Sequence, residues 1–246
     1  IYALDAATGA YKWNYTTGGV IVLSSPAVAD GIVYIGSLDK KVYALNGSNG
    51  ALIWNYTTGD MVVSSPAVAS GMVYVGSQDH KIYALDAATG AYKWNYTTGD
   101  CVYSSPAVAN GIIYIGSQDG KIYALDASNG NHIWNYTTNG KVDSSPAVAD
   151  GKVYVGSEDG KVYALHAETG AYIWSYSTGD MVVSSPAVAN GMVYVGSYDH
   201  LVYAIGPPPS VPTDSMPVII LSLFIIAILL VVGLLAVVLY RRRRKV

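Results

Sequence analysis

The sequence repeats a segment of roughly 40 residues along most of its length. The tripeptide Tyr-Ala-Leu recurs after 41 residues and then at intervals of 40, and the motif Tyr203-Ala204-Ile205 ends the series that begins at Tyr2, Tyr43, Tyr83, Tyr123 and Tyr163. A unit this short cannot bury an apolar face alone, so successive copies must stack to form a continuous core. The repeat therefore restricts the chain to folds made of stacked, nearly identical units.

Each copy is rich in β-branched and aromatic residues and is divided by turn signals. In one copy these signals separate four segments that we expect to be strands, at residues 64–69, 72–76, 81–85 and 92–97. Asp119-Gly120 and Asp159-Gly160 lie between the second and third segments of their copies and predict type I′ hairpins there. The third segment is apolar on both faces, so it needs neighbouring sheets on both sides.

A period of this length with four strands predicts the blades of a β-propeller. The fold class is therefore all-β, with four-stranded antiparallel blades and about five repeats visible in the chain. We expect two strands at the start, four whole blades, and three strands of a further blade. Such a chain either closes as a five-bladed ring or is a fragment of a larger one, and we favour the fragment.

The turn before the fourth strand carries the motif Ala-x-Asp-x-x-x-Gly-x-x-x-Trp. Its glycines are Gly9, Gly50, Gly90, Gly130 and Gly170, and its tryptophans are Trp13, Trp54, Trp94, Trp134 and Trp174. Two copies depart from the motif, with Asn46 and His166 in the Asp position. Over residues 1–205 the motif resembles the tryptophan-docking motif of the PQQ-like β-propeller repeat family. The resemblance implies rings of seven or eight blades, in which these tryptophans have the structural role of packing between blades.

The same family includes quinoprotein alcohol dehydrogenases and the propeller lipoproteins of bacterial outer-membrane assembly. The resemblance implies that its enzymes bind PQQ with calcium, an acidic catalytic residue and often a disulfide of adjacent cysteines. This chain has one cysteine, Cys101, which we interpret as a small apolar filler, and its blades are nearly identical. Because an active site is asymmetric, we expect no enzyme, no cofactor and no catalytic residues. The alternative is a fragment of a quinoprotein dehydrogenase whose catalytic blades are missing.

No metal site is expected either. His80 and His200 occupy the same tight turn in different copies. We interpret both as solvated turn residues, since their two copies lie too far apart along the series of repeats for them to share a metal ion.

The C-terminal segment differs from the repeats. Residues 218–240 contain no charged residue, which is enough apolar chain to cross a bilayer core as a helix. A basic cluster follows at residues 241–245 and predicts a cytoplasmic tail at 241–246. Residues 206–217 are rich in proline and predict a stiff linker. We therefore expect a single-pass cell-membrane protein whose propeller, residues 1–205, lies outside the cell.

Acidic residues predominate in the repeats. Of the 14 Lys and Arg residues in the chain, against 17 Asp and Glu, five belong to the basic tail. This balance excludes nucleic acid as a partner. We predict a non-enzymatic binding or scaffolding protein with protein or glycan partners outside the cell. Its predicted partner face collects the second-turn aspartates Asp39, Asp79, Asp119, Asp159 and Asp199 and the blade-link aspartates Asp60, Asp100 and Asp180.

Two further sets of polar residues recur. Serine pairs begin the first strand of each copy, as at Ser64-Ser65, and they either pack and bond to the backbone or line a polar funnel. Glycosylation acceptor motifs, Asn-x-Ser/Thr, occur at Asn14, Asn46, Asn55, Asn95 and Asn135. Since asparagine alternates with tryptophan along the fourth strand, the acceptors there should face away from the blade interface. They predict a glycosylated rim, against the alternative that strand residues match the motif by chance.

Overall fold

A computed structural model describes residues 1–206 of the chain, and this part is all-β. The two strands at its start are β1 (Tyr2–Leu4) and β2 (Tyr11–Asn14). Four complete sheets follow, which we number blades 1 to 4. Blade 1 is β3 (Ala27–Ala29), β4 (Ile32–Gly36), β5 (Lys41–Asn46) and β6 (Leu52–Thr57). Blade 2 is β7 (Ala67–Ala69), β8 (Met72–Gly76), β9 (Lys81–Asp86) and β10 (Tyr92–Thr97).

The next two blades have the same plan. Blade 3 is β11 (Ala107–Ala109), β12 (Ile112–Gly116), β13 (Lys121–Asp126) and β14 (His132–Thr137). Blade 4 is β15 (Ala147–Ala149), β16 (Lys152–Ser157), β17 (Lys161–His166) and β18 (Tyr172–Ser177). The last sheet is β19 (Ala187–Ala189), β20 (Met192–Gly196) and β21 (Val202–Ile205). In every sheet the strands pair antiparallel in chain order, which confirms the predicted fold class.

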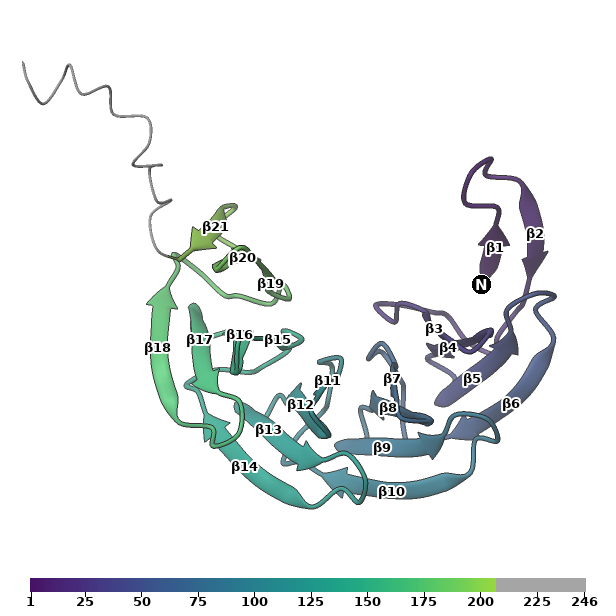
Figure 1. Ribbon diagram of the computed structural model, residues 1–246, viewed down its shortest axis with the longest axis horizontal. Coiled ribbons are helices and arrows are strands. Elements are labelled where there is room, and N and C mark those ends of the chain that lie inside the picture. Colours follow the sequence, from purple (N-terminus) through teal and green to yellow (C-terminus); the bar gives the residue numbers. More distant parts are fainter. Residues whose placement is uncertain (207–246) are drawn as a thin grey trace, which may run out of the picture. The chain divides into compact units, whose positions relative to one another are not determined.

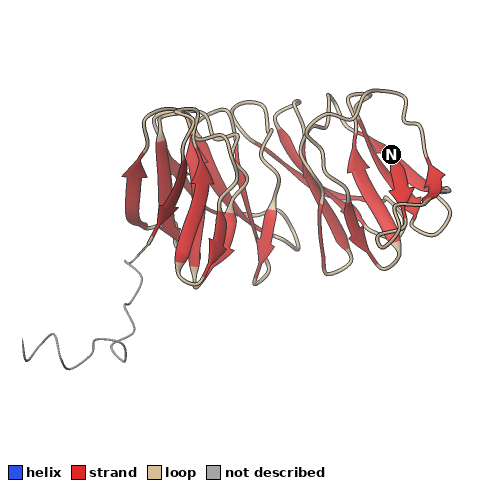
Figure 2. Ribbon diagram, turned by 90° about the horizontal axis from the view of Figure 1, so that it is seen from above, coloured by secondary structure: helices blue, strands red, loops and turns tan. Residues whose placement is uncertain are grey.

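The blades follow one another in an arc, with the short first strands on its inner side and the fourth strands on its outer side (Figure 1). Seen from above, the strands run between two opposite sets of loops (Figure 2). Within residues 1–206 the two ends do not pair, since β1–β2 and β19–β21 form separate sheets. The pairing of β2 with the last strands, which would close a five-bladed ring, is therefore not made in the described part of the chain.

The hydrophobic core lies between blades. One cluster joins Tyr34, Val42 and Trp54 of blade 1 to Val73 and Leu85 of blade 2, and equivalent clusters join each later pair of blades. The third strands supply both sides of this packing, and their central residues, such as 82–85, are buried. Fully burying an aliphatic or aromatic side chain contributes about 1.5–3 kcal/mol, so each interface between blades stabilises both of its neighbours.

Two local expectations were wrong. The first strand of blade 2 begins at Ala67, not at residue 64, because Pro66 has no N–H to donate and the Ser65 N–H bonds to Ser105 of the next blade. The second turns are not type I′, since only their last residue, such as His80 or Gly120, has a positive φ. The type I′ pattern of two positive φ values occurs instead at the first turns, as at Asn110-Gly111.

The predicted transmembrane helix at 218–240 and the basic tail at 241–246 lie outside the described residues, as does the predicted linker after residue 206. Among residues 1–206, the structure has no helix that is long and apolar enough to span a membrane.

Candidate interaction surface

The turns of each blade lie on two opposite faces, and backbone hydrogen bonds show which turns share a face. The Ala87 N–H donates to the Gly71 carbonyl at 2.9 Å, joining a third turn to a first turn. The Thr98 N–H donates to the His80 carbonyl at 2.8 Å, joining a blade link to a second turn. We call the second surface the link face. It is made of the second turns (37–40, 77–80, 117–120, 157–160, 197–200) and the links (58–63, 98–103, 138–143, 178–183).

The docking tryptophans lie between blades. The Trp54 indole N–H donates to the Ala87 carbonyl at 2.9 Å, and its ring lies on Gly90 of the next blade. Gly90 has a φ of +73°, and a Cβ there would lie 2.7 Å from the Trp54 ring, so the position requires glycine. The same contact joins Trp13 to Gly50, Trp94 to Gly130 and Trp134 to Gly170. Trp174 and Gly9 have no such partner within residues 1–206.

The second-turn aspartates of the predicted partner face take part in the turns themselves. Asp79 accepts hydrogen bonds from the Tyr83 hydroxyl at 2.5 Å, the Gly59 N–H at 2.7 Å and the Lys81 N–H at 3.1 Å. Asp119, Asp159 and Asp199 bond in the same way, and Asp39 bonds to Tyr43 and to the backbone of Lys41. Asp79, Asp119, Asp159 and Asp199 therefore attach their second turns to the link before each.

At Tyr43, Tyr83, Tyr123 and Tyr163, burial is the main cause of a raised pKa, and the hydrogen bond to the aspartate adds to it. The pKa of Tyr43 is raised to about 12, and those of Tyr83, Tyr123 and Tyr163 are raised further. The neutral phenol is the form that donates to the carboxylate. Ionisation of these tyrosines therefore opposes the folded turn.

The link aspartates are half-buried at Asp60 and Asp100 and exposed at Asp180. Asp60 forms an ion pair with Lys40 at 3.2 Å, and Asp100 lies 3.8 Å from His80. Asp180 accepts the Met181 N–H at 2.7 Å. The backbone N–H of the following residue is the main reason why the pKa values of Asp60 and Asp100 are lowered, so both are charged at neutral pH. These carboxylates are therefore open to solvent, at least in part, on the link face.

The serine pairs connect neighbouring first strands. Ser104 Oγ accepts the Gly116 N–H and donates to the Ser144 carbonyl, both at 3.0 Å. The Ser105 N–H donates to Ser145 Oγ at 2.9 Å, and the same bond is made by the pairs before and after it. This is the packing and backbone-bonding role, because the hydroxyls are occupied by bonds within the protein.

The blades differ in chemistry at one region of the link face. Tyr103 and Asp143 stand where Val63 and Val183 stand in other links. Gln118 Nε2 donates to Asp143 Oδ2 at 3.1 Å, while the other carboxylate oxygen is buried without a hydrogen-bond partner in the described structure. Burial raises the pKa of Asp143. The sequence reasoning missed this region because it treated the repeats as uniform. A comparison of the copies position by position would have found it.

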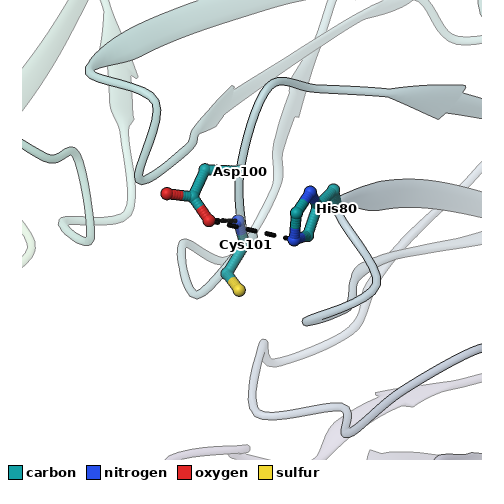
Figure 3. A group of neighbouring side chains, drawn as sticks. All are labelled: His80, Asp100 and Cys101. Carbon is teal, nitrogen blue, oxygen red and sulfur yellow. Dashed lines mark hydrogen bonds and ion pairs between the residues drawn. The ribbon is translucent and has the colours of Figure 1, made fainter.

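Next to this region the structure brings together His80, Asp100 and Cys101 (Figure 3). One ligand-type atom of each lies within 4.8 Å of the others. The Cys101 thiol donates to the Gln78 carbonyl at 3.3 Å, and burial raises its pKa. The sequence predicted a solvated turn for His80 and a filler for Cys101. The sequence did not predict that these two residues lie close together. His200, the other histidine at this turn position, lies between β20 and β21 of the last sheet.

The acceptor asparagines lie on the outermost strands. Asn14, Asn55, Asn95 and Asn135 are exposed, whereas the tryptophan before each is buried. Asn46 is half-buried at a third turn, where its side-chain oxygen accepts from the Ser48 backbone and hydroxyl. The rim sites are therefore accessible to modification, and Asn46 is the least accessible of the five.

Comparisons with known proteins agree with this architecture. A family model described as outer membrane protein assembly factor BamB matches residues 1–142 and 137–206. Among solved structures, BamB from Moraxella catarrhalis is 23% identical with a TM-score of 0.71, covering 80% of this chain and 65% of that one. A comparison with curated proteins found no match.

Two other solved structures share the fold. The computationally designed Ika8 protein is 18% identical with a TM-score of 0.76, covering 84% of this chain and 64% of its own. The quinohemoprotein alcohol dehydrogenase ADHIIG from Pseudomonas putida HK5 is 23% identical with a TM-score of 0.64, covering 80% of this chain and 44% of its own. The chain thus spans less than two thirds of each of the three structures.

Proposed function

Because the chain belongs to the PQQ-like β-propeller repeat family, through the model described as outer membrane protein assembly factor BamB, we propose that its propeller binds other macromolecules without catalysing a reaction. The partners are proteins or glycans outside the cell. The chain is held in the cell membrane by residues 218–240, with residues 241–246 in the cytoplasm. The acidic balance of the repeats favours a partner with basic or cationic groups.

The observation that carries the proposal is the chemical variation on the link face. Identical blades present the same surface several times over, so they cannot distinguish one part of a partner from another. Tyr103, Asp143 and their neighbours Gln118 and Lys141 break this uniformity, and tyrosine is a common anchor in protein interfaces. Many of the repeated polar groups are occupied by bonds within the protein, as at Asp79 and Ser104. Recognition therefore falls to the residues that differ.

The alternative, a piece of a quinoprotein dehydrogenase, has less support from the residues present. Enzymes of the family often use adjacent cysteines beside PQQ, and Cys101 has Asp100 and Val102 as its chain neighbours. It is the only cysteine of the chain. The alternative predicts calcium- and PQQ-dependent dye reduction with alcohols or sugars, whereas our proposal predicts none.

The experiment compares partner capture by the full-length protein and by variants that make the link face uniform. Tyr103→Val with Asp143→Val places in these links the residue that other links already contain. The matched control is Asp30→Asn with Asp150→Asn on the opposite face, where Asn110 and Asn190 occupy the equivalent turns. Crosslinking in native membranes should lose its specific product in the first variant and keep it in the second. The reverse pattern would show that the opposite face binds.

A further inference from the structure

Among residues 1–206, His80, Asp100 and Cys101 are the one group of three side chains placed to share a metal ion (Figure 3). They come from the second turn of blade 2 and the link that follows it. His80 Nε2 lies 3.8 Å from Asp100 Oδ1, and Cys101 Sγ lies within 4.8 Å of a ligand-type atom on each. We propose that this trio is a binding site for Zn²⁺. The inference does not depend on the partner-binding role.

The equivalent place in blade 1 already holds a cation. There the Lys40 ammonium lies 3.2 Å from Asp60 and 3.4 Å from the Gly59 carbonyl, and Met61 stands in the cysteine position. Blade 2 keeps the link aspartate but replaces the lysine by an imidazole and the thioether by a thiol. The positive charge that blade 1 carries in its own side chain is thus absent from blade 2 when His80 is neutral. A bound metal ion would restore it.

The other blades do not complete the trio. Blade 3 has Gly120, Gly140 and Lys141 at the three positions, and blade 4 has Gly160, Asp180 and Met181. The only cysteine of the chain therefore lies beside one of its four histidines and one of its link aspartates. The combination of ligand types is confined to a single blade, as expected of a site and not of a repeated structural element.

The backbone that carries the trio is held in place. Thr98 Oγ1 bonds to the carbonyl oxygens of both His80, at 3.0 Å, and Asp100, at 2.7 Å. The Gln118 N–H donates to the Cys101 carbonyl at 2.9 Å. Only side-chain rotations are then needed to bind an ion. His80 and Asp100 are exposed enough to make them, at 46% and 45% of their side-chain surface.

The ligand chemistry favours zinc. Imidazole, carboxylate and thiolate are its three protein ligands, at about 2.0–2.3 Å in tetrahedral geometry, which places ligand atoms about 3.5 Å apart. The thiolate selects against Mg²⁺ and Ca²⁺, which prefer oxygen ligands. On binding, the Cys101 thiol releases its proton to solvent as the sulfur–zinc bond forms, and the two anionic ligands neutralise the ion. The fourth position is left for water or for a group of a partner.

The test exchanges the two blades' residues in the full-length, reduced protein. His80→Lys with Cys101→Met installs the blade 1 residues in blade 2, so the variant keeps a combination that this fold already contains. Calorimetry with Zn²⁺ should show one ion bound by the native chain and at least 100-fold weaker binding by this variant. The reciprocal change, Lys40→His with Met61→Cys, should add a second bound ion. His132→Tyr, which adopts the residue of Tyr92 and Tyr172, should leave binding unchanged.

A second readout uses the single thiol. Zn²⁺ should slow alkylation of Cys101 by iodoacetamide, measured by mass spectrometry, and Co²⁺ should give the absorption of a thiolate-bound tetrahedral ion. Binding that survives the His80→Lys with Cys101→Met exchange, or unchanged alkylation of Cys101 in the presence of Zn²⁺, overturns the proposal. So does a reciprocal variant that folds but takes up no second ion.

Discussion

The interfaces between blades and the link face are built from the same repeat, but they use it differently. Each interface repeats one set of contacts, with a tryptophan on a glycine and the third strands packed together. On the link face the side chains change class from blade to blade, as from Val63 to Tyr103 to Asp143. The interior tolerates little variation because close packing makes each added or missing group costly. The link face can vary because it is partly solvated, and in our proposal these differences carry recognition.

The largest effect should come from breaking an interface. Trp94→Ala removes a buried ring that lies on Gly130, and we expect the free energy of unfolding to fall by about 3–5 kcal/mol. Trp174→Ala is the control, since Trp174 is half-buried and has no docking glycine within residues 1–206. It should cost about 1–2 kcal/mol. Urea denaturation measures both losses of stability. Unfolding is followed by circular dichroism of the backbone, because that signal does not come from the tryptophan that is replaced. Equal losses would show that docking on the next blade adds little.

The next effect concerns the second turns, where the link face meets the interior. Tyr83→Phe removes the hydroxyl that donates to Asp79. A hydrogen bond to a charged group contributes about 1.5–3 kcal/mol, and its loss should lower the free energy of unfolding by that amount. Tyr92→Phe, at an exposed position of the rim, is the matched control and should change stability little. The same urea titrations provide the measurement.

The tyrosines of these turns also predict a pH dependence. The folded pKa of Tyr43 is about 12, and those of Tyr83, Tyr123 and Tyr163 are raised further, above the unfolded value of about 10. A raised folded pKa means that the stabilisation is complete below about pH 10 and is lost as the pH rises from there towards 12. Urea midpoints measured from pH 8 to 12 should therefore stay level and then fall. In Tyr83→Phe the fall should be shallower.

The smallest effect on stability should come from the link-face variant designed to remove the proposed partner binding. Burial raises the pKa of Asp143, and one of its carboxylate oxygens is buried without a hydrogen-bond partner in the described structure, so keeping this group in the fold costs free energy. Tyr103→Val with Asp143→Val should leave the free energy of unfolding within about 0.5 kcal/mol of the native value, or raise it. A large loss of stability would mean that this region belongs structurally with the interior.

The rim offers a further test that leaves the fold unchanged. We expect glycans at the exposed acceptors Asn14, Asn55, Asn95 and Asn135, where they would also cover the outer strand edges. Mass spectrometry of peptides from native material is the measurement. Asn46 should be modified least, because it is half-buried and bonded within its turn. Finding all four rim sites unmodified would favour a chance match of strand residues to the motif.

Much of the fold follows from local patterns. The period, the four strands of each copy and the glycine and tryptophan of the docking motif are readable because identical copies must pack in the same way. The errors were local as well. Asp119-Gly120 suggested a type I′ turn, but Asp119 keeps a negative φ because its carboxylate bonds to Tyr123, Lys121 and the preceding link. Turn propensity alone does not include the bond to the link, which joins residues 20 positions apart.

By itself the sequence determined the all-β class, the blade and the residues that pack between blades, because each depends on spacing within one repeat. Only the tertiary structure decided which polar groups meet. The second turn of a blade and the link after its fourth strand lie on one face, so His80 lies beside Asp100 and Cys101, and Gln118 reaches Asp143. These partners are separated by 20 residues or more of the printed sequence. Their contact depends on antiparallel pairing and on the packing of neighbouring blades, which no single repeat contains.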